Sequence, residues 1–333
     1  MKKYKFLDHK RNTVLGLALL VLTGLCGTTH AQNAWPNKAI RIVVPYAPGG
    51  ANDILARVVA EKLAPALGQS VLVENKPGAG AAVGTELVVK SPPDGYTLLM
   101  AASGPIVFNP ALVAKLAYNP ITDLTPISLA GSFPMILAVN EASPAKTLAE
   151  LVTQSKANPS KFNYSYPSAS FQLVMELVKT KTGLKALNVP YQGSAPAMQD
   201  LLGGQIDSVF DPVTTNVNQL KAGSLRALAV STPNRLPALP NIPTFAELGY
   251  NSLTGSQWLG LSAPKNLPAP IAQRITALIP ELLAKPDIMA RLEEVQTLPR
   301  KTPVLGDEFS KLIQSQINTW TAVAKRAKVE VIV

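Results

Sequence analysis

The stretch IRIVVPYAPGGANDILAR, Ile40 to Arg57, decides the fold because a strand, a turn and the start of a helix follow one another in it. The apolar run Ile40 to Val44 predicts a buried strand, and the two adjacent glycines predict a tight turn. Asn52 or Asp53 is predicted to cap the helix that follows. Free N–H groups and the positive end of the helix dipole suit a carboxylate or phosphate. An ordinary turn, in which Asp53 only caps the helix, is the alternative.

Strand and helix patterns alternate along most of the chain, which predicts an α/β fold with mostly parallel sheets. Further strands are predicted at Val71–Asn75, Thr97–Ala102, Met135–Asn140, Phe162–Tyr166, Leu187–Tyr191, Ser208–Phe210, Arg226–Ser231 and Leu259–Ala263. Helical spacing of apolar residues occurs at Ile54–Leu63, Leu148–Lys156, Phe171–Lys179 and Pro196–Leu202.

The last third of the chain is different: Pro270–Val295 and Leu305–Lys328 have helical patterns with no strand predicted between them. Such helices are expected to pack over an earlier sheet, in a bilobed protein whose chain crosses to a second lobe and returns. The crossings are expected near Ala130–Gly131 and Thr254–Gly255. We therefore predict one lobe from residues 32–130 and 255–333, and a second lobe from residues 131–254.

Residues 1–31 have the anatomy of a secretory signal peptide, with a cationic start, an apolar run from Val14 to Leu25 and small residues up to Ala31. The apolar run is shorter than the roughly 20 residues that a transmembrane helix needs. We expect export to the periplasm and cleavage after Ala31. Lipid attachment at Cys26 is disfavoured because Leu25, and not a small residue, precedes it.

Cleavage of this leader would remove both histidines, His9 and His30, and the single cysteine, Cys26. The exported chain then lacks the groups for a cysteine nucleophile, a Ser-His-Asp triad or a His- or Cys-ligated metal. We expect no catalysis, no metal and no cofactor. The net charge would fall from +10 to +6, because the leader carries five cations and one anion. This balance favours anionic small molecules as partners, and the scattered cations argue against nucleic acid.

Two loops of the middle third, Asn163–Gln172 and Pro190–Pro196, place hydroxyls and small residues between a predicted strand and a helix. Ser168 or Ser170 is predicted to cap one helix and Ser194 the other, leaving N–H groups for a ligand; capping alone is the alternative. Open α/β sheets bind ligands at such carboxyl ends of strands. Neither these two loops nor the turn at Pro45–Gly50 contains Lys or Arg. An anion would therefore be held by N–H groups, hydroxyls and water.

A glycine cluster, Gly78, Gly80 and Gly84, resembles a dinucleotide-binding loop only weakly. Its spacing is one residue too long, and Lys76-Pro77 separates it from the preceding strand. A structural turn before a helix at Ala81–Lys90 is the favoured interpretation.

Five ordered stretches resemble the Bug family, the extracytoplasmic solute receptors of tripartite tricarboxylate transporters. They are WPNKAIRIVVPYAPGGANDILAR, VLVENKPGAG, PPDGYTLL, VPYQGSAPAMQDLLGGQID and LRALAVSTPNRLPALPNIPTFAELG. The resemblance covers residues 35–330. It implies a two-lobed, type II-like periplasmic binding protein, with two mixed or parallel sheets flanked by helices and two hinge crossovers. It also implies a monomer that holds a small carboxylate between its lobes and presents it to membrane transporter subunits or a sensor.

The resemblance also implies the residues that bind the ligand. From the first lobe they are Tyr46, Ala47, Pro48, Gly50, Asp53, Ser103 and Gly104. From the second lobe they are Tyr166, Ser168, Ala169, Ser170, Gly193 and Ser194. Pro167 and Phe171 stand where the family tends to have a glycine-rich stretch and a histidine, so the identity of the ligand is not carried over.

The positions of four further side chains in the sequence suggest roles for them. Asp211 ends a predicted strand and is expected either to accept a hydrogen bond from a protonated ligand group or to form a local turn. For Trp258, packing in the core is favoured over lining the cleft. Phe108 and Phe133 are candidates to line or narrow the cleft.

Three other functions are possible from the sequence: a secreted dinucleotide-dependent oxidoreductase built on Gly78–Gly84, a Ser/Lys hydrolase, and an interaction module without a ligand. The absence of histidine after cleavage and the spacing of the glycines weigh against the two enzymes.

Overall fold

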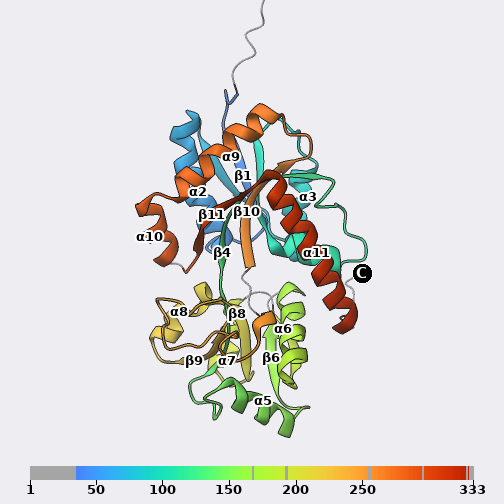
Figure 1. Ribbon diagram of the computed structural model, residues 1–333, viewed down its shortest axis with the longest axis vertical. Coiled ribbons are helices and arrows are strands. Elements are labelled where there is room, and N and C mark those ends of the chain that lie inside the picture. The colour runs from blue at the N-terminus through green and yellow to red at the C-terminus, as the bar shows by residue number, and fades with distance from the viewer. Residues whose placement is uncertain are drawn as a thin grey trace, which may run out of the picture. The chain divides into compact units, whose positions relative to one another are not determined.

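The computed structural model describes residues 35–166, 169–191, 194–253, 257–294, 296–327 and 329. The compact unit that starts at Lys38 contains two mixed β-sheets flanked by helices, as predicted (Figure 1). The predicted signal peptide lies outside the described residues. In the described ranges, every helix is too short or too polar to cross a membrane.

The first sheet has six strands in the order β11-β4-β10-β3-β1-β2. β1 runs parallel to β2 and β3, whereas β10 is antiparallel to β3 and β4, and β11 is antiparallel to β4. These strands are β1 (Ile40–Val44), β2 (Val71–Asn75), β3 (Thr97–Ala102), β4 (Leu124–Phe133), β10 (Gln257–Pro264) and β11 (Leu298–Leu305). Their helices are α2 (Ala51–Leu67), η1 (Ala79–Ala81), α3 (Ala82–Val89), η2 (Gly104–Phe108), α4 (Asn109–Leu112), α9 (Ala269–Leu283), α10 (Pro286–Glu294) and α11 (Gly306–Ala327).

The helix α2 forms because its apolar residues share one face. Leu55, Val59 and Leu63 follow one another at intervals of four, and each is buried. Burial of one such side chain stabilises the fold by about 2 kcal/mol. The helix ends at Gly68, whose φ of 69° lies in the left-handed region that favours glycine.

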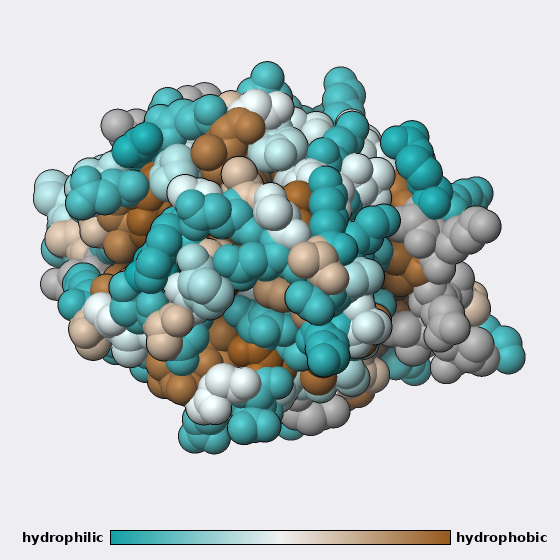
Figure 2. Space-filling model, turned by 90° about the horizontal axis from the view of Figure 1, so that it is seen from below, coloured by the Kyte–Doolittle hydropathy of each residue, from teal (hydrophilic) through white to brown (hydrophobic). Residues whose placement is uncertain are grey.

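The second sheet has five strands in the order β7-β6-β8-β5-β9. β6 is parallel to β7 and β8, and β5 is antiparallel to β8 and β9. The strands are β5 (Met135–Asn140), β6 (Asn163–Tyr166), β7 (Leu187–Pro190), β8 (Ser208–Pro212) and β9 (Leu225–Val230). The helices are α5 (Leu148–Ala157), α6 (Ala169–Thr182), α7 (Ser194–Leu202) and α8 (Val213–Lys221), with a short turn η3 (Asn251–Leu253). Figure 2 shows the side on which this sheet lies in Figure 1: hydrophilic residues dominate, with hydrophobic patches between them.

The prediction of mostly parallel sheets is wrong, because β10 and β11 in the first sheet and β5 in the second sheet pair with their neighbours in antiparallel directions. The chain leaves the first sheet at Phe133 and enters the second at Met135, with Pro134 between them. Ala130 and Gly131, near which the crossing was expected, lie inside β4. The expected return at Thr254–Gly255 lies outside the described residues.

The sequence failed to predict two strands, β4 and β11, for the same physical reason. β4 contains Pro126, and β11 contains Pro299 and Pro303, so both resemble loops. β11 is an edge strand whose pairing with β4 jumps between Pro299 and Val304. Pro126 lies beyond the part of β4 that pairs with β11. The region between the two C-terminal helical segments therefore holds a strand, against the prediction.

Candidate ligand-binding site

The turn after β1 is held by a side chain inside the following helix. Gly50 precedes α2 with no side-chain cap, so the expectation that Asn52 or Asp53 is the N-cap is wrong. Asp53 is the third residue of α2, and its Oδ2 accepts the Gly49 N–H at 2.9 Å. Gly49 has a φ of 87°, which only glycine adopts readily. The turn itself, including Ala47, Pro48 and Gly50, is exposed.

Two further groups fix the Asp53 carboxylate. Arg57 Nε donates to Oδ2 at 3.0 Å, and Asn75 Nδ2 donates to Oδ1 at 3.0 Å and to the Tyr46 carbonyl at 3.1 Å. Burial raises the pKa of Asp53, but the hydrogen bonds from Arg57, Gly49 and Asn75, with the Arg57 charge, hold this pKa below its ordinary value. The ionised Asp53 carboxylate therefore stabilises the turn, and its charge is balanced by the ion pair with Arg57. This pairing occupies the Arg57 guanidinium.

The segment after β3 approaches the Tyr46 side chain closely. A Cβ added to Gly104 would stand 2.6 Å from the Tyr46 hydroxyl, so this approach requires glycine. Burial and the neighbouring Tyr118 raise the pKa of Tyr46, which keeps its hydroxyl protonated. Ser103 is buried and donates to the Gln257 side-chain oxygen. The structure thus brings Tyr46, Ser103 and Gly104 together beyond the ends of two neighbouring parallel strands.

In the second sheet, Ser194 and Asp211 form a direct pair. Ser194 is the first described residue of α7, and its Oγ donates to Asp211 Oδ1 at 2.7 Å, so it does not simply cap its helix. Asp211 Oδ2 accepts from Thr215 Oγ1 at 2.6 Å and from Asn216 Nδ2 at 3.0 Å. Asp211 is 4% exposed, and burial raises its pKa to about 6 although these three hydrogen bonds lower it. Asp211 ties the start of α7 to the start of α8.

The remaining predicted residues that the structure describes, Tyr166, Ala169 and Ser170, lie at the end of β6 and the start of α6. Tyr166 ends this strand half-buried, with its ring 6.4 Å from that of Tyr164, and Ser170 is buried in the first turn of α6. Ala169 begins α6. Ser168 and Gly193 lie outside the described residues. Because β6, β7 and β8 are parallel, the loops that follow them meet at one edge of the sheet.

A cavity of about 180 Å³ is lined by residues of both sheets. Trp258 lines it and belongs to the core, as predicted: its ring meets Phe309 edge-on at 5.1 Å, and its Nε1 donates to Gln316 Oε1 at 2.6 Å. Phe108 also lines the cavity, with its ring 4.8 Å from Trp320. Phe133 is buried in β4 and is not among the lining residues. The full lining is Ser103, Phe108, Met135, Val174, Leu177, Phe210, Ser231, Ser252, Leu253, Gln257, Trp258, Gln316 and Trp320.

Sequence reasoning did not identify Asn75, Gln257 or Gln316 as site residues. Each comes from a segment far along the chain from the group that it contacts, and no local pattern marks it. The sequence predicts Asn52 only as a helix cap, but its buried Oδ1 has no hydrogen-bond partner among the described residues.

The glycine cluster after β2 has a packing role. A Cβ on Gly84 would stand 2.6 Å from the Lys76 carbonyl oxygen and 2.8 Å from Pro45 Cα. The Gly80 carbonyl accepts a hydrogen bond from Asn109 Nδ2 at 3.0 Å. These contacts agree with a structural turn, and the dinucleotide interpretation has no support.

Comparison with known proteins assigns the family. The family model "Tripartite tricarboxylate transporter family receptor" matches residues 55–329. The chain is 32% identical over 314 residues to the protein BugT of Bordetella pertussis, covering 93% of this chain and 95% of BugT.

Two solved structures are similar in fold and sequence. The periplasmic binding protein BugD has a TM-score of 0.80 and 33% identity, covering 89% of this chain and 99% of BugD. A protein of R. palustris solved with adipate has a TM-score of 0.81 and 30% identity, covering 88% of this chain and 98% of that protein. These matches confirm the resemblance to the Bug family, and with it the expectation of a solute-binding receptor and not an enzyme. The chain belongs to the family of tripartite tricarboxylate transporter receptors, whose members are periplasmic solute-binding proteins.

Proposed function

We propose that this protein captures a small organic carboxylate between its two sheets and presents it to membrane transporter subunits or to a sensor. Residues 32–130 with 255–333 would form one lobe, residues 131–254 the other, and closure about the two crossings would trap the ligand. Export with cleavage after Ala31 and a monomeric state belong to the same proposal.

The observation that carries the proposal is the pair of loop clusters at the carboxyl ends of parallel strands. Tyr46, Ser103 and Gly104 form one cluster in the first sheet, and Ser194 with Asp211 forms the other in the second. Both clusters carry hydroxyls, but those of Ser103 and Ser194 already donate to Gln257 and Asp211, so a carboxylate must compete with these partners for the proton. The adipate in the R. palustris relative supports a dicarboxylate as the ligand class.

The electrostatics of the turn after β1 support binding through neutral donors. The cations that flank this turn in the chain are both paired: Arg41 of β1 with Glu74 at 3.3 Å, and Arg57 of α2 with Asp53 at 3.0 Å. A carboxylate would therefore be held by hydroxyls, backbone N–H groups and bridging water.

The test is the thermal stability of the leader-free protein, first stripped of ligand by partial unfolding and refolding. Adipate at a hundred times its dissociation constant stabilises a one-site receptor by about 2.7 kcal/mol, which should raise Tm by roughly 5 °C. A panel of mono-, di- and tricarboxylates then identifies the preferred class. No rise with any acid, in protein whose cooperative unfolding shows that it is folded, would contradict the proposal.

A further inference from the structure

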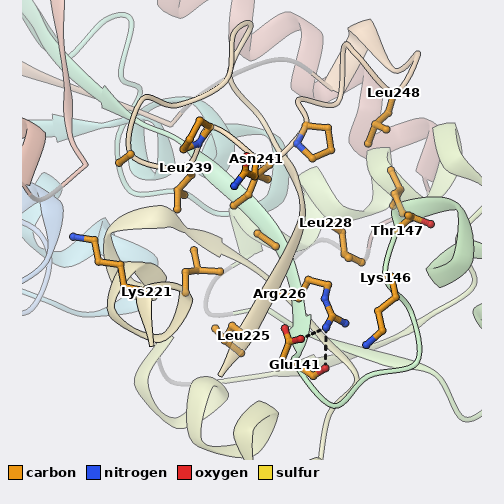
Figure 3. Close-up of a pocket in the computed structure, with 17 residues that line it drawn as sticks. Glu141, Lys146, Thr147, Lys221, Leu225, Arg226, Leu228, Leu239, Asn241 and Leu248 are labelled. Carbon is orange, nitrogen blue, oxygen red and sulfur yellow. Dashed lines mark hydrogen bonds and ion pairs between the residues drawn. The ribbon is translucent and has the colours of Figure 1, made fainter. Parts of the chain in front are cut away.

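A large groove lies on the outer side of β9, apart from the candidate ligand site (Figure 3). Its volume is about 660 Å³, against about 180 Å³ for the cavity between the sheets. The groove lies beside the start of β9, which pairs with the end of β5, whereas Asp211 pairs with Ile136 near the start of β5. A molecule in this groove and a ligand at the Ser194 loop can therefore be bound at the same time.

The groove exposes the edge of a sheet. β9 ends the order β7-β6-β8-β5-β9, so among the described strands it has a neighbour on one side only. At its far end Val230 N donates to the Pro243 carbonyl, and Phe245 N donates to the Val230 carbonyl, each at 3.0 Å. Residues 225–228 line the groove, and along them the described chain adds no strand on the outer side, whereas Ala229 is fully buried. Such an edge is a template for an added strand.

The floor of the groove is apolar. Leu220, Ala227, Leu239 and Ile242 are partly buried and pack on the core of the second sheet. Leu248, which stands at the margin of the groove in Figure 3, is 37% exposed. These side chains give an added strand an apolar surface on which alternate residues can pack.

The margin of the groove is positively charged. Arg226 is paired with the Glu141 carboxylate, and its guanidinium donates to the carbonyl oxygens of Glu141, Ser143 and Ala145 at 3.1 to 3.4 Å, so it is neutralised and fixed. Lys146 and Lys221 are exposed and form no ion pair within the described ranges. Lys146 Nζ donates to the Ser143 carbonyl at 3.3 Å, which solvates its charge. Two lysines without an ion pair in the described ranges therefore flank an apolar strand edge.

We infer that this groove docks an extended segment of a partner protein, in which apolar residues alternate with acidic ones, by adding that segment to β9. The apolar floor would receive one set of side chains, and Lys146 and Lys221 would face the acidic set. The inference rests on membership of a transporter-receptor family, whose members must present a bound solute to another protein. It does not depend on which carboxylate is bound.

A synthetic octapeptide that alternates Asp with Val or Leu tests the inference in the leader-free protein. We expect it to slow amide hydrogen exchange at residues 225–228, which line the groove. Replacement of its Asp residues by Lys, or N-methylation of alternate backbone nitrogens, should weaken binding by about tenfold or more, since the first removes charge complementarity and the second removes ladder hydrogen bonds.

The protein variant is the double change Lys146→Glu and Lys221→Glu. The control matched in charge is the double change Lys115→Glu and Lys285→Glu, at two exposed lysines of the first sheet's region. The double variant should bind the acidic peptide about tenfold more weakly and the control equally well. The Tm rise with adipate, measured on the same samples, should be unchanged in both. Loss of that rise in all variants would count against the carboxylate proposal alone.

Three results would overturn the inference. One is no slowing of exchange at residues 225–228 by the acidic peptide. Another is equal binding of the N-methylated peptide, which would exclude strand addition. The third is a concentration-dependent dimer in sedimentation that Leu248→Asp abolishes, which would assign the groove to a second copy of this chain.

Discussion

The Ser194 hydroxyl donates its only proton to Asp211 Oδ1 across 2.7 Å. While Asp211 is ionised, Ser194 can offer an incoming carboxylate only lone pairs, because a hydroxyl has one donor. A ligand that accepts the Ser194 proton must compete with Asp211 for it. Asp211 keeps two other donors, Thr215 and Asn216, so it can release Ser194 without becoming unpaired.

Ser194→Ala should weaken adipate binding by about tenfold, the effect of one hydrogen bond to a charged group. Titration calorimetry on the ligand-stripped protein measures it. Ser224→Ala is the control, since Ser224 Oγ bonds the Gln219 carbonyl away from the loop clusters and should leave the affinity unchanged. Equal affinities in all three proteins would remove Ser194 from the site.

Asp211→Asn should change how stability depends on pH. Burial raises the folded-state pKa of Asp211 from 3.8 to about 6, so the folded protein binds this proton more tightly than the unfolded chain. The free energy of unfolding from this group therefore falls as pH rises from about 4 to 6, by about 3 kcal/mol in all.

This pH effect is measured as a difference between urea denaturation curves of the natural protein and Asp211→Asn at pH 4, 5, 6 and 7.5. Taking the difference cancels the carboxylates common to both. The stability of the variant relative to the natural protein should increase with pH over the window from 4 to 6. A difference that is flat across this window would mean that Asp211 titrates normally.

Asp53→Ala should destabilise the protein by about 1–3 kcal/mol at pH 7, because the Gly49 N–H, Arg57 and Asn75 all lose an acceptor. The folded-state pKa of Asp53 lies below its ordinary value, so its stabilising effect is present above that value and declines as pH falls through the folded-state pKa. Urea denaturation at pH 7 and pH 3 should thus show a smaller loss at pH 3. A loss that is equal at both pH values would assign the effect to packing.

Gly104→Ala should be destabilising because the new Cβ meets the Tyr46 hydroxyl at 2.6 Å. Overpacking of this kind costs about 1–3 kcal/mol. Tyr46→Phe removes the oxygen, so Gly104→Ala should cost much less in that background. A double-mutant cycle by thermal denaturation measures the coupling. Additive effects would show that the two side chains do not meet.

Local sequence was sufficient to predict the strand-turn-helix unit at Ile40–Leu63, because its strand, glycines and helical face follow one another directly. It was not sufficient for the role of Asp53. The residue was predicted as a cap because of its type, but its function depends on Gly49 and on Asn75, which the folding of β2 beside β1 brings near. Residue type predicts that a polar side chain is needed near the start of the helix. The packing of the strands determines which groups that side chain contacts.

In the second loop cluster too, the sequence predicts the residues but not the contact between them. Ser194 and Asp211 were each selected from their positions after strands, but their pairing needs α7 and the end of β8 to meet. β4 and β11 were not predicted because prolines resemble loop residues unless the edge position of a strand is known. The groove beside β9 is built from six separate runs of residues between Glu141 and Leu248, and no single one of them has a pattern that indicates it.

The commitment of Arg57 to Asp53 has a consequence for how the receptor behaves in different media. Dissolved salt screens attraction between a free cation and an anionic ligand, but it hardly affects short hydrogen bonds from neutral donors. A receptor that holds a carboxylate by hydroxyls and N–H groups should therefore keep nearly the same affinity between dilute and concentrated salt. Its occupancy would follow the concentration of the solute and not the ionic strength around it.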